Sequence, residues 1–144
     1  MNITADYGMT VRKTLVALLT AYVVLPACNP VYFLKGGIYR ELDANLTITA
    51  LLGNPDRYLD KVIVFSVRFY KKGNLPCPLG EGYQNFVIAD RISYITLDKV
   101  WMKKDKASVL DTLSENETIV MRAKVFKVDN ERDPNLEALE IVKE

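Results

Sequence analysis

The sequence predicts an all-β fold: a small closed barrel of five strands, with one helix between the third and fourth strands and a signal peptide in front. Five segments between residues 61 and 142 are rich in β-branched and aromatic side chains. The first, Lys61–Tyr70, is apolar on both faces at its start and on one face later, as a strand shared by two sheets would be. The length of 144 residues fits one domain.

Residues 1–27 have the pattern of a bacterial export signal. Arg12 and Lys13 form a basic flank, and Thr14–Leu25 is an uncharged run of 12 residues, whereas a transmembrane helix needs about 20 apolar residues. Leu25-Pro26-Ala27-Cys28 follows and resembles the lipobox of bacterial lipoproteins. The resemblance implies cleavage after residue 27 and diacylation of Cys28. A buried helix that ends in Pro-Ala-Cys is the alternative.

Lipid on Cys28 would tether the domain to a membrane, in an extracytoplasmic space of the cell envelope. Asn29 stands where an Asp commonly retains lipoproteins in the inner membrane of Gram-negative cells. For a Gram-negative source, the resemblance therefore implies the outer membrane, with the domain facing the periplasm.

The charge balance bears on the partner. Residues 1–27 hold two basic residues and one acidic residue of the 19 and 18 in the chain, so the mature chain would carry 17 of each. A formally neutral chain has no bulk attraction to phosphate. Nucleic acid is therefore disfavoured as a partner.

Cys77 would be the one cysteine left besides the lipidated Cys28, so no intramolecular disulfide is expected. It lies in a loop rich in Gly and Pro, Gly73–Gly82. Nearby Lys71 and Lys72 could lower the pKa of its thiol. A functional thiol therefore stands open beside an ordinary loop cysteine.

Residues 28–45 are predicted to be an anchor and tether. This segment lacks the Gly/Ser bias of a free linker, and its apolar side chains are expected to pack on the domain, the membrane or a partner. Residues 46–144 are the predicted domain. It begins with a short helix, Thr47–Leu52, which Gly53-Asn54-Pro55 stops.

Alternation and turn residues place the strands. In Lys61–Tyr70 the odd positions are all apolar, and the small Ser66 marks a predicted bend. A helix is expected over Asp105–Leu113, where apolar residues recur on one face. The other predicted strands are Tyr83–Asp90, Ser93–Val100, Thr118–Val128 and Leu136–Val142.

Five strands with a helix between the third and fourth is the order of the OB-fold barrel. The chain also resembles bacterial envelope proteins whose OB-fold is of the tRNA-anticodon-binding-like type. Asn54-Pro55 and Tyr58-Leu59-Asp60-Lys61 match the entry to the first strand of that family, and Leu136-Glu137-Ala138-Leu139-Glu140-Ile141 matches its end. The resemblance implies a fold and no settled activity.

Nothing in the sequence predicts catalysis. The chain has no His, and it carries no paired carboxylates at an identifiable site, no nucleophile motif and no phosphate-binding loop. We expect no enzymatic activity, no cofactor and no metal. The acidic loop Asp129–Asp133 leaves a calcium site open as an alternative to a plain hairpin loop, although it lacks the EF-hand spacing.

A binding surface is the stronger prediction. OB barrels bind ligands across strands two and three and the adjoining loops, and aromatic or Arg side chains there can stack or form forked hydrogen bonds. Alternatively, these tyrosines are there only because they form strands well. The candidate binding residues are Arg68, Tyr70, Tyr83, Asn85, Tyr94 and Thr96.

Together these features predict a lipid-anchored, non-enzymatic module of the cell envelope. Its partner is expected to be another envelope protein, bound through this face and the Gly73–Gly82 loop. A surface that binds an oligonucleotide or oligosaccharide is the alternative, with Arg122, Lys124 and Phe126 as a further stripe for nucleic acid. Whether a small molecule binds is left open by the sequence.

Overall fold

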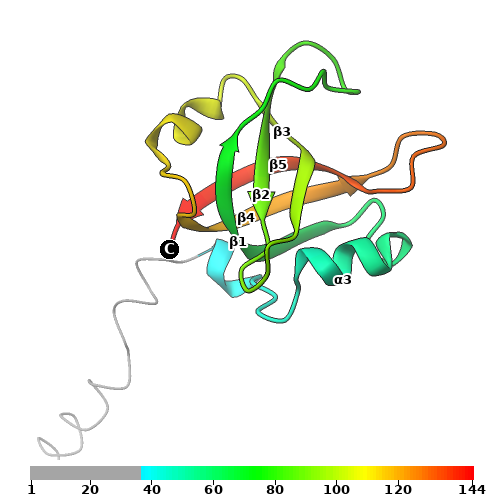
Figure 1. The fold of residues 1–144 in the computed structure, drawn as a ribbon, viewed down its shortest axis with the longest axis horizontal. Coiled ribbons are helices and arrows are strands. Elements are labelled where there is room, and N and C mark those ends of the chain that lie inside the picture. The colour runs from blue at the N-terminus through cyan, green and yellow to red at the C-terminus, as the bar shows by residue number, and fades with distance from the viewer. Residues whose placement is uncertain (1–36) are drawn as a thin grey trace, which may run out of the picture. The chain divides into compact units, whose positions relative to one another are not determined.

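Five strands close into a barrel in the order β1-β2-β3-β5-β4 (Figure 1). The computed structural model describes residues 37–144, so Cys28 and the predicted signal peptide lie outside the described residues. Neighbouring strands are antiparallel except β3 and β5, which run parallel. The strands are β1 (Val62–Lys72), β2 (Tyr83–Ala89), β3 (Thr96–Lys103), β4 (Thr118–Phe126) and β5 (Asn135–Lys143). The predicted all-β, OB-fold-like barrel is confirmed.

Short helices fill the connections. Helix α3 (Ile48–Gly53) starts where the Thr47 hydroxyl accepts a hydrogen bond from the Ala50 amide, at 3.1 Å. The helix expected over Asp105–Leu113 is a 3₁₀ helix of six residues, η4 (Ala107–Thr112). Two further 3₁₀ turns are η2 (Ile38–Arg40) and η3 (Pro55–Arg57). Within residues 37–144, no helix is long and apolar enough to cross a membrane.

The inward side chains of β1 follow the predicted alternation. Ile63, Phe65, Val67 and Phe69 all belong to the main core and are at most 8% exposed. The strand pairs with β4 over its first part and with β2 over its last part, and Arg68 has a partner in both. It is therefore shared between the two halves of the barrel, as its sequence predicts.

The pairing around Ser66 is regular, with no β-bulge at this residue. The pairing of β1 with β4 is unbroken from Val62 to Arg68, and the register shift lies between Phe69 and Lys71. Ser66 lies on the outer side of the strand and is nevertheless only 5% exposed. Its small side chain therefore suits a buried position.

The third strand begins three residues later than predicted, at Thr96, and continues through Trp101 and Met102 to Lys103. Residues 91–95 form a wide turn instead. The Asp90 amide donates a hydrogen bond to the Ile95 carbonyl at 2.8 Å, across the base of this turn.

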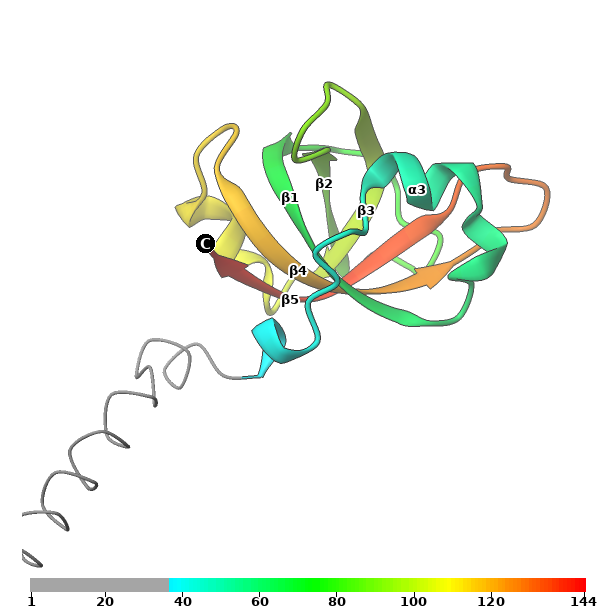
Figure 2. The ribbon, with the colours of Figure 1, turned by 90° about the horizontal axis from the view of Figure 1, so that it is seen from below.

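The start of the described chain packs on the barrel (Figure 2). Ile38 is 3% exposed and forms a small outer cluster with Val64 and Val120. The Asp43 amide bonds to the Val64 carbonyl at 2.9 Å, and Glu41 pairs with Arg122 at 3.2 Å. The compact unit therefore begins at Gly37, inside the segment predicted as a tether.

Candidate functional site

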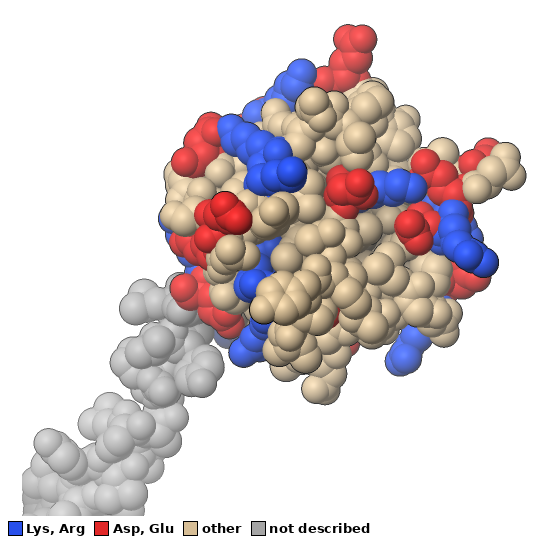
Figure 3. Space-filling model, viewed as in Figure 1, with Lys and Arg blue, Asp and Glu red and all other residues tan. Residues whose placement is uncertain are grey.

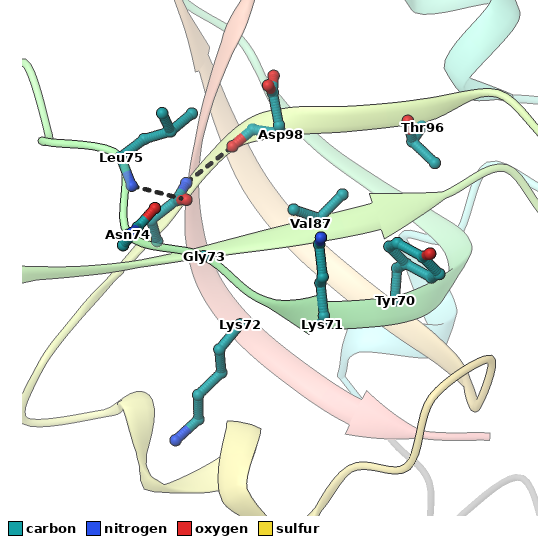
Figure 4. Close-up of a pocket in the computed structure, with 10 residues that line it drawn as sticks. Tyr70, Lys71, Lys72, Gly73, Asn74, Leu75, Val87, Thr96 and Asp98 are labelled. Atoms are coloured by element: carbon teal, nitrogen blue, oxygen red, sulfur yellow. Dashed lines mark hydrogen bonds between the residues drawn. The ribbon is translucent and has the colours of Figure 1, made fainter.

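A groove of about 590 Å³ crosses the outer surface of β1, β2 and β3 (Figure 4). Its floor and walls combine apolar side chains with single polar groups. It is lined by Tyr70, Lys71, Lys72, Gly73, Asn74, Leu75, Asn85, Val87, Thr96 and Asp98. This size lies within the range of about 300–1,000 Å³ typical of ligand pockets.

Two β-bulges aim side chains into the groove. In β1, Tyr70 is an extra residue between the pairs Phe69–Ile88 and Lys71–Val87, so Tyr70 and Lys71 both line the groove although they are consecutive. In β3, two residues stand opposite the single Val87, and one of them is Asp98. The chemistry of this surface therefore depends on irregular pairing.

The groove has few charged residues, and they are of both signs. Lys71 lies beside Tyr70, with its amine 5.5 Å from the ring centroid. Lys72 points away and pairs with Asp111 of η4 (Figure 4). Asp98 contributes a carboxylate at the β3 side. Figure 3 shows a wide uncharged area on the side of the barrel that carries β1, β2 and β3, with most charged groups toward its edges.

Asn85 supports the groove from below. It is 3% exposed, and its side-chain amide nitrogen donates to the carbonyls of Asp98 (2.7 Å) and Val100 (2.9 Å). Its side-chain oxygen accepts from the Leu75 amide at 3.2 Å. All three bonds join backbone groups of β3 and of the loop after β1, so this predicted binding residue fixes that loop in place.

Arg68 holds the turn between β2 and β3. Its Nε donates to the Asp90 carbonyl at 2.9 Å, and its Nη2 donates to the Ser93 carbonyl at 2.7 Å. Its Nη1 lies 3.4 Å from the side-chain oxygen of Asn116. These bonds engage all three guanidinium nitrogens within the chain.

A second hollow, of about 440 Å³, continues from the groove toward this turn. The two hollows share Tyr70 and Thr96. Tyr94 stands at the turn end with 96% of its surface exposed, next to Ile92 with 82%. The second hollow is lined by Arg68, Tyr70, Ala89, Tyr94, Thr96 and Asn116.

Tyr83 lies apart from both hollows. Its hydroxyl donates to Glu137 Oε1 at 3.1 Å. Burial raises the pKa of Tyr83 above its ordinary value, and the hydrogen bond to the Glu137 carboxylate raises it further. The structure thus joins this predicted residue to β5.

Cys77 does not have an activated thiol. Burial raises the pKa of Cys77, outweighing the hydrogen bonds from the amides of Leu79 and Gly80 that lower it. The net shift of the Cys77 pKa is therefore upward, opposite to the lowering expected from Lys71 and Lys72. A raised pKa leaves less thiolate, the nucleophilic form, at neutral pH.

In the loop Asp129–Asp133, which was considered as a calcium site, the central carboxylate of Glu131 already has partners within the chain. Glu131 accepts a hydrogen bond from Asn135 at 3.0 Å and pairs with Lys99 at 3.2 Å, and these contacts lower the pKa of Glu131. Across residues 37–144, no three His, Cys, Asp or Glu side chains are grouped as a metal site would need.

The structure therefore brings together five of the six predicted residues. Tyr70 and Thr96 line both hollows, Arg68 and Tyr94 line the second, and Asn85 lies under the first. Sequence reasoning named the Gly73–Gly82 loop, which holds Asn74 and Leu75, but missed Lys71, Val87 and Asp98. Strict alternation places Lys71 on the face opposite Tyr70, and only the bulge turns both into one groove.

No protein-family model matches the sequence, and neither does any curated protein. The chain shows 14% identity and a TM-score of 0.48 to a candidate aspartyl-tRNA synthetase of Leishmania major, over 65% of this chain and 19% of that one. The values for the Stn1–Ten1 complex of S. pombe are 15% and 0.42, over 58% and 57%.

A candidate nucleic acid-binding lipoprotein of Klebsiella pneumoniae shows 14% identity and a TM-score of 0.47, over 67% of this chain and 82% of that one. This chain thus spans less than two thirds of the first two of these structures. The assignment of an OB-fold-like barrel rests on the strand order of the chain itself.

Proposed function

We propose that this chain is a lipid-anchored, non-enzymatic binding module of the cell envelope, which engages another envelope protein through the groove and the Gly73–Gly82 loop. The observation that carries the proposal is the preformed groove on the β1–β3 surface, in which seven of the ten lining residues are uncharged. A fixed concave surface with a few polar groups is the usual form of a binding site.

The lining suits an extended segment of polypeptide. Val87 and Leu75 offer apolar contacts, and the Tyr70 ring can cover a side chain of the partner. Lys71 and Asp98 supply one charge of each sign, which would fix the direction of a segment with complementary charges.

Nucleic acid suits this surface less well. Asp98 would repel phosphate, and Arg68 is engaged with carbonyl groups. Arg122, the first residue of the other basic stripe, pairs with Glu140 and Glu41. The second candidate ligand is an oligosaccharide, because the Tyr70 ring, the Thr96 hydroxyl and the Asp98 carboxylate line one groove and can bind a sugar face and its hydroxyls.

Charge reversal tests the groove. The Lys71→Glu variant should lose a protein that wild type captures from envelope extract, while the matched Lys124→Glu variant, exposed on β4, should keep it. Identical partner profiles for wild type and both variants would contradict the assignment of the groove. Capture that free glycan abolishes would instead favour the oligosaccharide.

The anchor is supported by the basic flank, the uncharged run and the position of Cys28. Intact mass measurement in cells that process lipoproteins should show a mature chain that starts at acylated Cys28. The Cys28→Ala variant should lose lipid labelling. A wild-type mass that retains residues 1–27 without lipid would remove the anchor from the proposal.

A further inference from the structure

We propose that the turn between β2 and β3 docks on the lipid surface of the membrane, with Ile92 and Tyr94 in the headgroup region. The turn comprises residues 91–95. This inference rests on the anchor of the proposed function and adds an orientation: the turn faces the membrane, and the Gly73–Gly82 loop faces the aqueous side.

The turn presents large apolar side chains to solvent. Tyr94 is 96% exposed and Ile92 is 82% exposed, with Ile95 at 39% in the same turn. Single exposed apolar residues are ordinary, but a contiguous group marks a contact surface. Tyr is enriched at membrane–water interfaces, where its ring meets the acyl boundary and its hydroxyl stays hydrated. Arg91, also exposed, adds attraction to anionic lipid phosphate.

The turn is held in one conformation. Arg68 donates hydrogen bonds to the carbonyl of Asp90, just before the turn, and to the carbonyl of Ser93, in its middle. The Asp90 carboxylate, 1% exposed as a residue, accepts hydrogen bonds from the Ser93 hydroxyl at 2.9 Å and the Thr49 hydroxyl at 3.2 Å. Because the turn is already ordered, docking loses little conformational entropy.

The anchor limits how far the barrel can move from the membrane. Eight residues separate Cys28 from Gly37, which allows a reach of at most about 30 Å when fully extended. A domain of about 100 residues has a radius of gyration of about 13 Å. The barrel is thus kept within about its own diameter of the lipid surface.

The turn and the start of the described chain lie at the same end of the barrel in Figure 1, and Figure 2 shows them at opposite edges of that end, with the turn beside α3. In Figure 1 the start of the described chain, α3 and the turn between β2 and β3 lie along the lower edge of the barrel. The loop between β1 and β2 lies at the upper edge, and it carries Leu79, which is 45% exposed. Leu79 is therefore a matched apolar position at the opposite end.

Fluorescence quenching tests this orientation. A chain of residues 28–144 with Cys28→Ser and an N-terminal hexahistidine tag is held on vesicles of phosphatidylethanolamine and phosphatidylglycerol that contain a nickel-chelating lipid. Tyr94→Trp and Leu79→Trp are compared, with the buried Trp101 as background, and brominated phosphatidylglycerol is the quencher. The Tyr94→Trp variant should show a blue shift and a loss of fluorescence, which Ile92→Ser in the same chain should reduce.

The Leu79→Trp variant should show neither change. Equal quenching in both variants, or no quenching in Tyr94→Trp, would overturn the orientation, and the second result would also fit a turn that binds protein. Thermal unfolding matching wild type shows that each variant is folded. Because the nickel lipid replaces the acyl chains, this result is independent of whether Cys28 is acylated, so the anchor and the docking turn can fail separately.

Discussion

The side-chain oxygen of Asn85 lies 2.0 Å from the point that a Cβ atom would occupy at residue 73, so only Gly fits there. The side-chain oxygen of Asn85 occupies this space because it accepts a hydrogen bond from the Leu75 amide. The Gly73–Asn85 contact thus couples the course of the loop to the floor of the groove.

The Gly73→Ala variant should be less stable than wild type by about 1–3 kcal/mol, since the added methyl forces Asn85 out of its buried hydrogen bonds. Urea denaturation measures this difference. Gly82→Ala is the control, because a Cβ there meets nothing within 4 Å. Equal losses in both variants would contradict the role of the contact.

The Asn85→Leu variant should lose about 1–3 kcal/mol of stability, because it leaves two backbone carbonyls without their side-chain donor. The carbonyls concerned are those of Asp98 and Val100. Hydrogen exchange of the Leu75 amide should also accelerate. Asn74→Leu, at an exposed position in the same loop, should change stability little; if the two variants behaved alike, Asn85 would not be the support of the loop.

The Arg68→Met variant should loosen the turn between β2 and β3, because hydrogen bonds from a charged donor contribute about 1.5–3 kcal/mol. The measurement is hydrogen exchange at the Asp90 amide, which bonds to the Ile95 carbonyl. The matched variant is Arg91→Met, exposed in the same turn. Unchanged exchange with loss of partner capture would instead make Arg68 a direct ligand contact, as the sequence predicts.

Alkaline stability should depend on Tyr83. Its pKa in the folded chain is raised above the ordinary 10.0, so the folded state binds this proton more tightly than the unfolded state does. The stability that results is fully present below about pH 10 and is lost as the pH rises through the folded pKa. Urea denaturation between pH 8 and about 11 should show a steeper decline for wild type than for Tyr83→Phe. Parallel declines would contradict the raised pKa of Tyr83 as the cause.

The sequence alone determined the barrel and the inward face of its strands. Period-two alternation in β1 placed Ile63, Phe65, Val67 and Phe69 in the core, because burial of apolar side chains is the main driving force of folding and a strand turns every second residue to one side. The turn residues between the strands gave their number and order.

The tertiary structure decided how the surface is built. The extra residue at Tyr70 and the two residues opposite Val87 set which side chains share the groove, and such bulges arise from the fit between paired strands. The sequence predicts that the Arg68 side chain is available to bind a ligand. The side chain reaches the carbonyls of Asp90 and Ser93 only because β1 and β2 pair at that point. Every residue has a backbone carbonyl, so the sequence does not indicate which carbonyls will accept these hydrogen bonds. For the same reason the docking of Ile38 on Val64 and Val120 emerges only when strands distant in sequence come together.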